Sequence, residues 1–415
     1  MQAALAALLI LTMLGPFMTF ASTQTTGEGS PVRQVAYILV FGLLIFGTRP
    51  FDHPRRLLVI PMTMLLALGW CWLSIGWAID PGIAVRRLIL TSVIIWSLFI
   101  AIDQLGYERP VKLLRNLLIA ILVANFITVF LFPDFGVHPM DEIGDKRLIG
   151  DWRGVLMHKN VAGAVCAITI ITFLFDADRY PKLLRGAVIA ASLLFLILTQ
   201  SKTSLGLLGF CIAVGFLFER YNAKYRLFVI SALCMVGIAG MLLLNLYRNP
   251  LAMQFSDPDA FTGRAFIWES LLTFAADHPL LGAGFGSFWN IGPASPIFKY
   301  GNGWVQLVTT GHNGFLDLLA TIGLPGLVLA MVAAFIAPVA RLLTRTSINP
   351  ARGALVLAIM LFCFGHNFTE SSLLDRDSIV EVALIFAIAL IRPLSSTRGS
   401  RMSKIWGDQT GSRSA

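Results

Sequence analysis

The chain has 415 residues, of which 56% are hydrophobic and 13% are charged, and its formal net charge at neutral pH is +9. Soluble domains carry about 25% charged residues and a smaller apolar fraction, so this composition excludes an ordinary soluble protein. It indicates a multi-pass membrane protein. Because the bilayer core offers no water to the backbone, we expect the spanning elements to be helices.

Twelve apolar runs approach the roughly 20 residues that a helix needs to cross about 30 Å of hydrocarbon, although some are short. The sequence therefore predicts an all-α integral membrane protein with about 12 transmembrane helices. The predicted cores are Ala3–Phe20, Val35–Gly47, Leu57–Trp77, Leu88–Ile102, Leu113–Phe132, Gly154–Phe175, Gly186–Thr199, Leu205–Phe218, Leu227–Leu246, Gly314–Ala340, Gly353–His366 and Ile379–Ile391. Residues 1–391 would form one polytopic domain, residues 247–311 a long external loop between the ninth and tenth helices, and residues 392–415 a disordered basic tail.

The basic residues predict the orientation, because Lys and Arg are retained on the cytoplasmic side of a membrane. With both termini cytoplasmic, every second loop is basic. These internal clusters include Arg49, Arg55 and Arg56; Arg109, Lys112 and Arg115; Arg179, Lys182 and Arg185; Arg220, Lys224 and Arg226; and Arg341, Arg345 and Arg352. The positive charge is therefore a topological signal, and we expect no nucleic-acid partner.

The first apolar segment has an alternative interpretation as a cleaved secretory signal, since Ala21 follows the apolar run and a small residue, Thr19, lies two positions earlier. No basic residue precedes the run, and a retained helix preserves the alternation of every later loop. The five cysteines all lie in predicted spans without a Cys-x-x-Cys pair, so neither a disulfide nor a thiolate metal site is expected. No nucleotide-binding motif and no metal-spaced histidine pair is found, and we expect no cofactor.

The long external loop carries many aromatic residues, which at a membrane surface usually act as interfacial anchors. Together they could also form apolar faces for sugar rings or a lipid chain. Within the loop, Thr262 is a candidate N-cap for an amphipathic helix that Pro279 would end. Arg264 would occupy the first turn, where it opposes the helix dipole but suits a phosphate. Alternating glycines at 282, 284 and 286 follow and form a weak candidate for anion binding.

Three further polar runs lie at the predicted external ends of spans. In the first, Arg153, Lys159 and Asn160 surround His158; either they face a polar cavity, or Lys159 snorkels to the interface while His158 caps a neighbour. The second run is a tight turn that contains Lys202, which could also be a topological exception. The third ends in Glu370, which could orient a histidine or merely solvate a helix end. A fourth candidate, the His312–Asn313 pair, stands where the long loop enters the tenth helix.

All these polar sets fall on one predicted side of the membrane, where helix packing could gather them around a cavity. Several cations would suit a diphosphate and stabilise it as it departs. His312 or a carboxylate would remove a proton from an attacking hydroxyl.

These motifs resemble the O-antigen ligase and O-antigen polymerase superfamily, most closely the exopolysaccharide polymerases of the succinoglycan type. The resemblance covers about residues 150–370. It is carried by Arg153-Gly-x4-Lys159-Asn160, Gln200-Ser-Lys202-Thr-Ser, Gly263-Arg264-x3-Trp268, His278-Pro-Leu-Leu-Gly282-x-Gly284 and His312-Asn313-x2-Leu316-x6-Gly323-x2-Gly326. Members are twelve-helix glycosyltransferases of the bacterial cytoplasmic (inner) membrane. The resemblance implies that His312 activates the acceptor and that Arg264 engages the donor pyrophosphate.

By this resemblance the chain would polymerise undecaprenyl-diphosphate-linked oligosaccharide at the periplasmic face, without metal or nucleotide sugar. The predicted catalytic residues are His312 and Glu370. The predicted substrate-binding residues are Arg264, Lys202, Arg153, Lys159, Asn160 and Asn313. Lys202 stands where ligases of the family usually show arginine, which favours a polymerase over a ligase. A chain-length regulator and a flippase of the same pathway are candidate partners.

Three other functions remain open at this point. A ligase would transfer the glycan to lipid A core or to protein. A transporter, including a flippase for the same lipid-linked sugars, would place its polar residues near the bilayer midplane, often on broken helices with internal symmetry. We find no repeat between the two halves of the sequence, and the unusual motifs lie on the long loop. A non-catalytic assembly partner is the third and least supported class.

Overall fold

A computed structural model describes residues 1–14, 31–138, 148–220, 222–225, 228, 229, 232, 235, 263–375 and 378–395. Throughout these residues the named elements are helical, and the strand-like contacts amount to one isolated bridge between Val137 and Trp152. The predicted all-α class is confirmed for the described part of the chain. Most of the predicted core Leu227–Leu246, the first part of the long loop and residues 396–415 of the predicted tail lie outside it. Residues 392–395, the predicted start of that disordered tail, belong to the last described helix instead.

The described helices follow the predicted cores in order. They are α1 (Gln2–Leu14), α2 (Pro31–Gly47), α3 (Met62–Leu73), α4 (Pro81–Leu105), α5 (Glu108–Leu131), α6 (Pro133–Gly136), α7 (Lys159–Leu174), α8 (Lys182–Leu198), α9 (Lys202–Glu219), α12 (Arg264–Asp277), α13 (Ile297–Tyr300), α14 (Gly314–Met331), α15 (Ala337–Thr344), α16 (Pro350–His366) and α17 (Ile379–Ser395), with a π-helical turn, η9 (Val332–Ile336), between α14 and α15.

Four helical segments of the described chain are long and apolar enough to cross a membrane: Pro81–Leu105, Glu108–Leu131, Lys202–Glu219 and Gly314–Thr344. Shorter apolar helices accompany them, among them Lys159–Leu174 and Pro350–His366. The protein is thus a multi-pass helical membrane protein, while the number of 12 spans stays a prediction.

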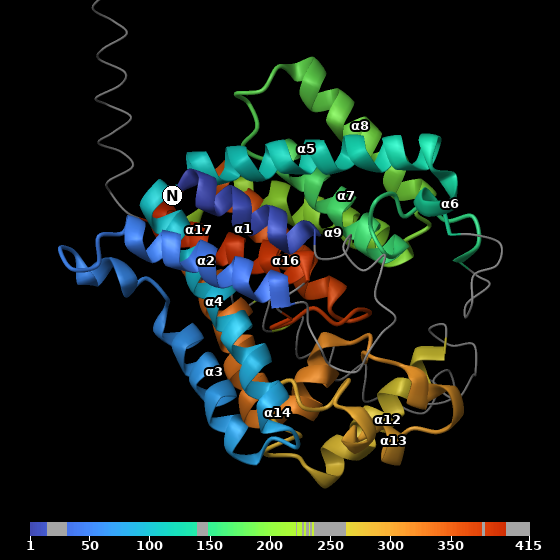
Figure 1. The fold of residues 1–415 in the computed structure, drawn as a ribbon. Coiled ribbons are helices and arrows are strands. Elements are labelled where there is room, and N and C mark those ends of the chain that lie inside the picture. The colour runs from blue at the N-terminus through green and yellow to red at the C-terminus, as the bar shows by residue number, and fades with distance from the viewer. Residues whose placement is uncertain are drawn as a thin grey trace, which may run out of the picture.

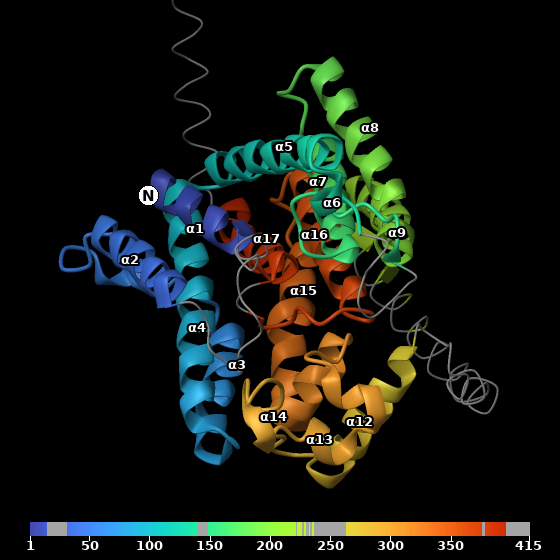
Figure 2. The same ribbon diagram turned by 45° about the vertical axis from the view of Figure 1, so that its right-hand side comes forward.

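The helices form a bundle and a smaller group at one end of it. Helix α16 packs against α9 and α17, and α7 packs against α8 and α9. The smaller group consists of α12, α13 and the first part of α14 (Figures 1 and 2). We call residues 263–311, which include α12 and α13, the loop subdomain. It has its own apolar core, which includes Ile267, Leu271 and Phe288.

An ionic network joins three of the loops that the basic residues place inside the cell. Glu108, at the start of α5, contacts Arg179 from the α7–α8 connection at 2.7 Å and also contacts Arg352 at the start of α16. Arg352 lies 3.6 Å from Asp176. Loops predicted to share one side therefore meet in space, which supports the predicted alternation.

The predicted core Gly314–Ala340 is interrupted in the structure. The backbone of Gly323 leaves the helical region (φ 68°, ψ −179°), and Pro325 follows. The loop subdomain satisfies backbone groups at this break: Leu324 donates its N–H to the carbonyl of Pro279 at 2.8 Å. On the other side, the indole of Trp70 donates to the carbonyl of Ile322 at 2.9 Å. The break is therefore where the subdomain docks onto the bundle.

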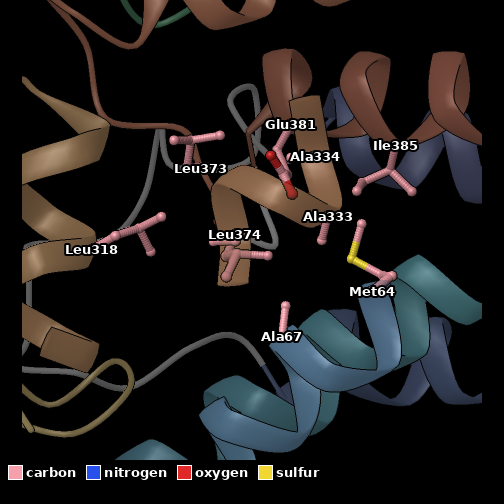
Figure 3. A pocket seen from close by; sticks show the side chains of 10 residues that line it. Met64, Ala67, Leu318, Ala333, Ala334, Leu373, Leu374, Glu381 and Ile385 are labelled. Atoms are coloured by element: carbon pink, nitrogen blue, oxygen red, sulfur yellow. The ribbon is translucent and has the colours of Figure 1, made fainter. Parts of the chain in front are cut away.

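A small apolar cavity lies beside the π-helical turn (Figure 3). Met64, Leu318 and Ala333 are among the residues that line it, and the carboxyl group of Glu381 in α17 also reaches it. Glu381 is buried, and within the described residues its Oε2 has no hydrogen-bond partner. A carboxyl group so placed costs stability and is not explained by packing.

Replacing Gly323 by Ala tests the docking break. A Cβ at this position would lie 2.1 Å from the carbonyl oxygen of Leu280, and the positive φ disfavours any side chain. We expect Gly323→Ala to lower the unfolding free energy by more than about 2 kcal/mol, measured as thermal stability in detergent. The control is Gly42→Ala, because a Cβ at Gly42 meets open space within a helix and should be neutral or stabilising. Equal effects of the two changes would contradict the docking explanation.

Candidate active site

The carboxylate of Glu370 is shared by three side chains from distant parts of the sequence. Its Oε1 accepts a hydrogen bond from the Arg264 guanidinium at 2.7 Å and another from the Asn160 amide at 2.6 Å. Its Oε2 lies 3.1 Å from Nδ1 of His312. The first turns of α7 and α12, the residue pair before α14 and the segment after α16 thus meet at one carboxylate.

This group of four residues, which we call the Glu370 cluster, is largely shielded from solvent. The side chains of Arg264 and Glu370 are 17% and 18% exposed, and that of His312 is 31% exposed. Burial raises the pKa of Glu370, but the hydrogen bond from His312 and the charge of Arg264 outweigh it and hold that pKa at about 2. Glu370 is therefore an anion at neutral pH, and the least shielded of the three side chains is the histidine.

His312 is held in a backbone conformation that few side chains adopt, with φ at +49°. The preceding residue fixes it from both sides: Gly311 donates its N–H to Oδ2 of Asp317 at 3.2 Å, and its carbonyl accepts from the indole of Trp268 at 3.0 Å. A Cβ on Gly311 would lie 2.4 Å from Oδ1 of Asp317, so only glycine fits. The imidazole is thus positioned by a strained turn whose preceding residue, Gly311, is hydrogen-bonded on both sides.

Asn313 has a structural task in this turn. Its Oδ1 accepts the N–H groups of Phe315 and Leu316, both at 3.1 Å, and so caps α14. Its amide donates to the carbonyl of Phe368 at 3.3 Å. The cap also ties α14 to the segment that carries Glu370. These contacts account for Asn313 without a ligand, and its predicted contact with substrate stays a prediction.

Backbone contacts fix the distance between the His312 turn and Glu370. The N–H of Gly314 lies 2.9 Å from the carbonyl of Asn367 and 3.1 Å from that of Glu370. A Cβ on Gly314 would meet Oδ1 of Asn367 at 2.1 Å. This close approach requires glycine and brings the start of α14 against the end of α16.

The first polar run lies at the start of a helix, and the predicted core Gly154–Phe175 began that helix five residues too early. Helix α7 starts at Lys159, and His158 is its N-cap, where Nδ1 accepts the N–H of Asn160 at 3.1 Å. Burial lowers the pKa of His158 to about 4, so this ring is neutral at neutral pH. Lys159 pairs with Asp151 at 2.5 Å. His158 thus caps the helix that it precedes, not a neighbouring helix as the capping interpretation had it.

The predicted cations lie at different distances from the cluster. Arg264 is part of it. Lys202 is exposed at the start of α9, and its neighbour Thr203 contacts Thr369 at 3.1 Å, one residue before Glu370. Arg153 instead donates from Nε to the carbonyl of Phe135 at 2.9 Å. Within the described residues the structure therefore gathers Arg264, Asn160, His312 and Glu370, while Arg153 and Lys159 make their polar contacts elsewhere.

The glycines at 282, 284 and 286 are explained by packing. All three have positive φ, as expected for the turn after Pro279. Added Cβ atoms would collide with the carbonyl of Ala320, with Ala78 and with the side chain of Arg87 at 2.4 to 2.9 Å. The glycines allow the loop subdomain to press against α14 and α4, and the suggestion of an anion site is not needed to account for them.

Two anchoring residues were not identified from the sequence. Arg87 of α4 donates to the carbonyls of Gly286 and Trp289 at 2.5 and 2.8 Å and so holds the loop subdomain. Asp317 of α14 accepts from the indole of Trp289 at 2.8 Å as well as from Gly311. An acidic residue in the first turn of an otherwise apolar helix was the available signal for Asp317.

Comparison with known proteins extends this picture. Residues 187–331 match the family model described as "O-Antigen ligase". This segment is similar to the O-antigen ligase domain. The matched segment contains Lys202, Arg264 and His312, whereas Glu370 and Asn160 lie outside it. The resemblance noted from the motifs is confirmed.

Three similar proteins have names that are consistent with this match. Proteins named "Putative polysaccharide ligase" from Rickettsia felis and Rickettsia bellii are 24% and 25% identical over 64% of this chain and 65% of their own lengths. The exopolysaccharide production protein ExoQ of Rhizobium meliloti is 24% identical over 46% of each chain. The chain thus spans just under two thirds of the Rickettsia relatives and about half of the Rhizobium one.

The low pKa of Glu370 predicts an acid limit to stability. The pKa of Glu370 falls from 4.5 to about 2 in the folded protein, so the charged cluster stabilises the fold above about pH 4.5. That contribution is lost as the pH falls toward 2. We expect the difference in melting temperature between wild type and Glu370→Gln to be constant above about pH 5 and to shrink below it. A difference that is unchanged at pH 2 would show that the charge of Glu370 is not stabilising.

Proposed function

We propose that this protein is a membrane glycosyltransferase that polymerises undecaprenyl-diphosphate-linked oligosaccharide repeat units into exopolysaccharide or O-antigen. The observation that carries the proposal is the Glu370 cluster, in which one carboxylate holds a histidine and an arginine side by side. The O-antigen ligase domain supports a reaction on lipid-linked glycans. The reaction would take place at the periplasmic face of the cytoplasmic membrane.

In this mechanism His312 is the general base. When Nδ1 is protonated and donates to Glu370, Nε2 carries the lone pair and can accept a proton. The Glu370 carboxylate fixes this tautomer and stabilises the imidazolium that forms, as a carboxylate does in other carboxylate–histidine pairs. Glu370 thus acts through His312, which refines its predicted catalytic role.

Arg264 would stabilise the leaving group. One terminal nitrogen donates to Glu370, and the guanidinium has further N–H groups for phosphate oxygens. Its position in the first turn of α12 is poorly explained by helix stability, and a phosphate ligand supplies a reason. A positive charge already at the site also allows departure of the pyrophosphate without a metal.

The proposed step transfers the glycan with inversion. A hydroxyl oxygen of the acceptor attacks the anomeric carbon at the reducing end of the donor, and the bond from that carbon to the diphosphate oxygen breaks. The hydroxyl proton moves to Nε2 of His312. Undecaprenyl diphosphate leaves with both electrons of the broken bond, beside Arg264. In the polymerase, the acceptor is the non-reducing end of a second lipid-linked repeat unit.

A ligase is the second candidate, because the family model and the names of two relatives favour it. The acceptor would then be a lipid A core sugar or a protein. The likeness to the exopolysaccharide production protein supports the polymerase, as does Lys202, since an ammonium does not offer the two parallel hydrogen bonds of arginine. Either enzyme would work with a flippase, and a polymerase would also work with a chain-length regulator.

Replacement of His312 tests the general base. We expect His312→Asn to reduce glycan transfer by about 100- to 10,000-fold, the range for loss of a general base, while protein abundance in the membrane is unchanged. Asparagine is chosen because it tolerates a positive φ, so the turn is preserved. His312→Ala should have the same effect on polymer.

The matched control is His278→Asn, which changes an exposed histidine of the same loop subdomain. It should leave transfer unaffected. Polymer of normal length and amount in cells that carry only His312→Asn would refute the assignment of the base.

Glycan from a deletion strain distinguishes the candidate functions. We expect single repeat units on the lipid carrier at the outer leaflet, with long chains restored only by active protein, as measured by gel and mass analysis. Long carrier-linked chains that lack their final acceptor would instead show a ligase. Repeat units trapped at the inner leaflet would show a flippase and contradict the glycosyltransferase.

A further inference from the structure

The tryptophans of the loop subdomain fall into two kinds. Trp268 and Trp289 have structural tasks: their indole N–H groups bond to the carbonyl of Gly311 at 3.0 Å and to Oδ1 of Asp317 at 2.8 Å. Trp304 is different, because its side chain is exposed at 49%. An exposed indole on a subdomain whose other tryptophans are anchored calls for a separate explanation.

Trp304 stands on a rigid support. It belongs to a 3-10 turn, Gly303–Leu307, whose next residue, Val305, is 3% exposed in the core of the subdomain. Gln306 then donates from Nε2 to the carbonyls of Phe298 and Gly301, both at 2.9 Å. The backbone beneath the indole is therefore fixed, and binding to its face would require little ordering of the chain.

The ring also stands at the edge of the Glu370 cluster. A Cβ on Gly263 would lie 3.2 Å from Cζ2 of Trp304, so the ring edge lies close to the residue just before Arg264. Arg264 in turn bonds to Glu370 at 2.7 Å. The exposed indole is thus beside Gly263, whose neighbour in the chain is the group that would hold the donor diphosphate.

We propose that Trp304 is a sugar-binding platform, on which one of the pyranose rings that follow the diphosphate of the donor stacks. A pyranose presents a face of C–H groups, which an indole can cover while the hydroxyls stay in water. A platform next to the diphosphate site would hold the reducing end of the glycan in line with the acceptor hydroxyl. This proposal rests on the proposed glycosyltransferase function and assigns a binding site for its sugar moiety.

A membrane-interface anchor is the competing explanation of an exposed aromatic ring. Phe298 of α13 provides a matched control, because it lies in the same subdomain and is 47% exposed. Leucine at either position keeps an apolar side chain for the interface but removes the flat ring. The changes Trp304→Leu and Phe298→Leu therefore separate stacking from anchoring.

The test measures binding to the purified full-length protein in lipid nanodiscs. The probes are undecaprenyl diphosphate alone, the undecaprenyl-diphosphate-linked repeat unit isolated from a deletion strain, and the same oligosaccharide without its carrier. We expect Trp304→Leu to weaken binding of the carrier-linked repeat unit by about tenfold, the effect of losing one stacked ring. Binding of undecaprenyl diphosphate alone should not change, and Phe298→Leu should change neither.

Four other outcomes would overturn the sugar-binding platform, its assignment to the donor, or the proposed function. Equal weakening by Trp304→Leu and Phe298→Leu would show an interface anchor and overturn the platform. A Trp304-dependent affinity for the free oligosaccharide alone would assign the ring to the acceptor and overturn the donor assignment. If wild type binds undecaprenyl diphosphate and the linked repeat unit equally well, the platform fails while the proposed function stands. If wild type binds neither carrier-linked probe, the proposed function itself fails.

Discussion

A partly buried carboxylate organises the candidate active site. The Glu370 carboxylate is largely removed from water and is stable there because Arg264, Asn160 and His312 surround it. An isolated carboxylate in such a place would be strongly unfavourable. The requirement to satisfy it brings α7, α12, α14 and the end of α16 to one point, and so fixes the relation between bundle and loop subdomain.

The break in α14 provides the backbone groups to which the loop subdomain binds. A continuous α14 would have no free backbone groups for the subdomain to bond. At Gly323 the helix opens, and Leu324 bonds to Pro279. On the opposite side Arg87 holds the carbonyls of Gly286 and Trp289. A segment rich in glycine and proline is therefore held in place by hydrogen bonds as well as by its apolar core.

The periodicity and composition of the sequence predict most of the helices, because apolar runs of this length have few other solutions in a membrane. The bounds of α7 differ from the prediction because hydropathy cannot distinguish a capped helix start from a turn that precedes it. The segment 154–158 is apolar enough to extend the predicted core, yet His158 caps the helix only from Lys159 onward.

The Glu370 cluster could be predicted only in part. Arg264 and His312 could be singled out from the sequence. Arg264 opposes the dipole in the first turn of a helix, and His312 is a polar residue where the long loop enters an apolar helix, so each position is unfavourable unless the residue has a function. Glu370 was singled out as a residue that could orient a histidine, but that Arg264 and His312 share it could not be derived, since Glu370 is 106 residues from Arg264 and 58 residues from His312 along the chain. The anchors Asp317 and Arg87 act on backbone atoms that no sequence pattern reveals. Arg153 and Lys159 were grouped with the cluster by charge alone, and the structure gives them other partners.

The ion pair between Arg264 and Glu370 also bears on how the product would leave the candidate active site. Arg264 is already paired with this carboxylate, so a diphosphate bound as proposed would share the guanidinium with an internal anion. Sharing of this kind would lower the affinity for the spent carrier. After transfer of the glycan, Glu370 would still hold Arg264 and so favour release of the carrier into the bilayer. The carboxylate that orients the base would thus also speed product release, and a tighter grip on diphosphate would slow each round of elongation.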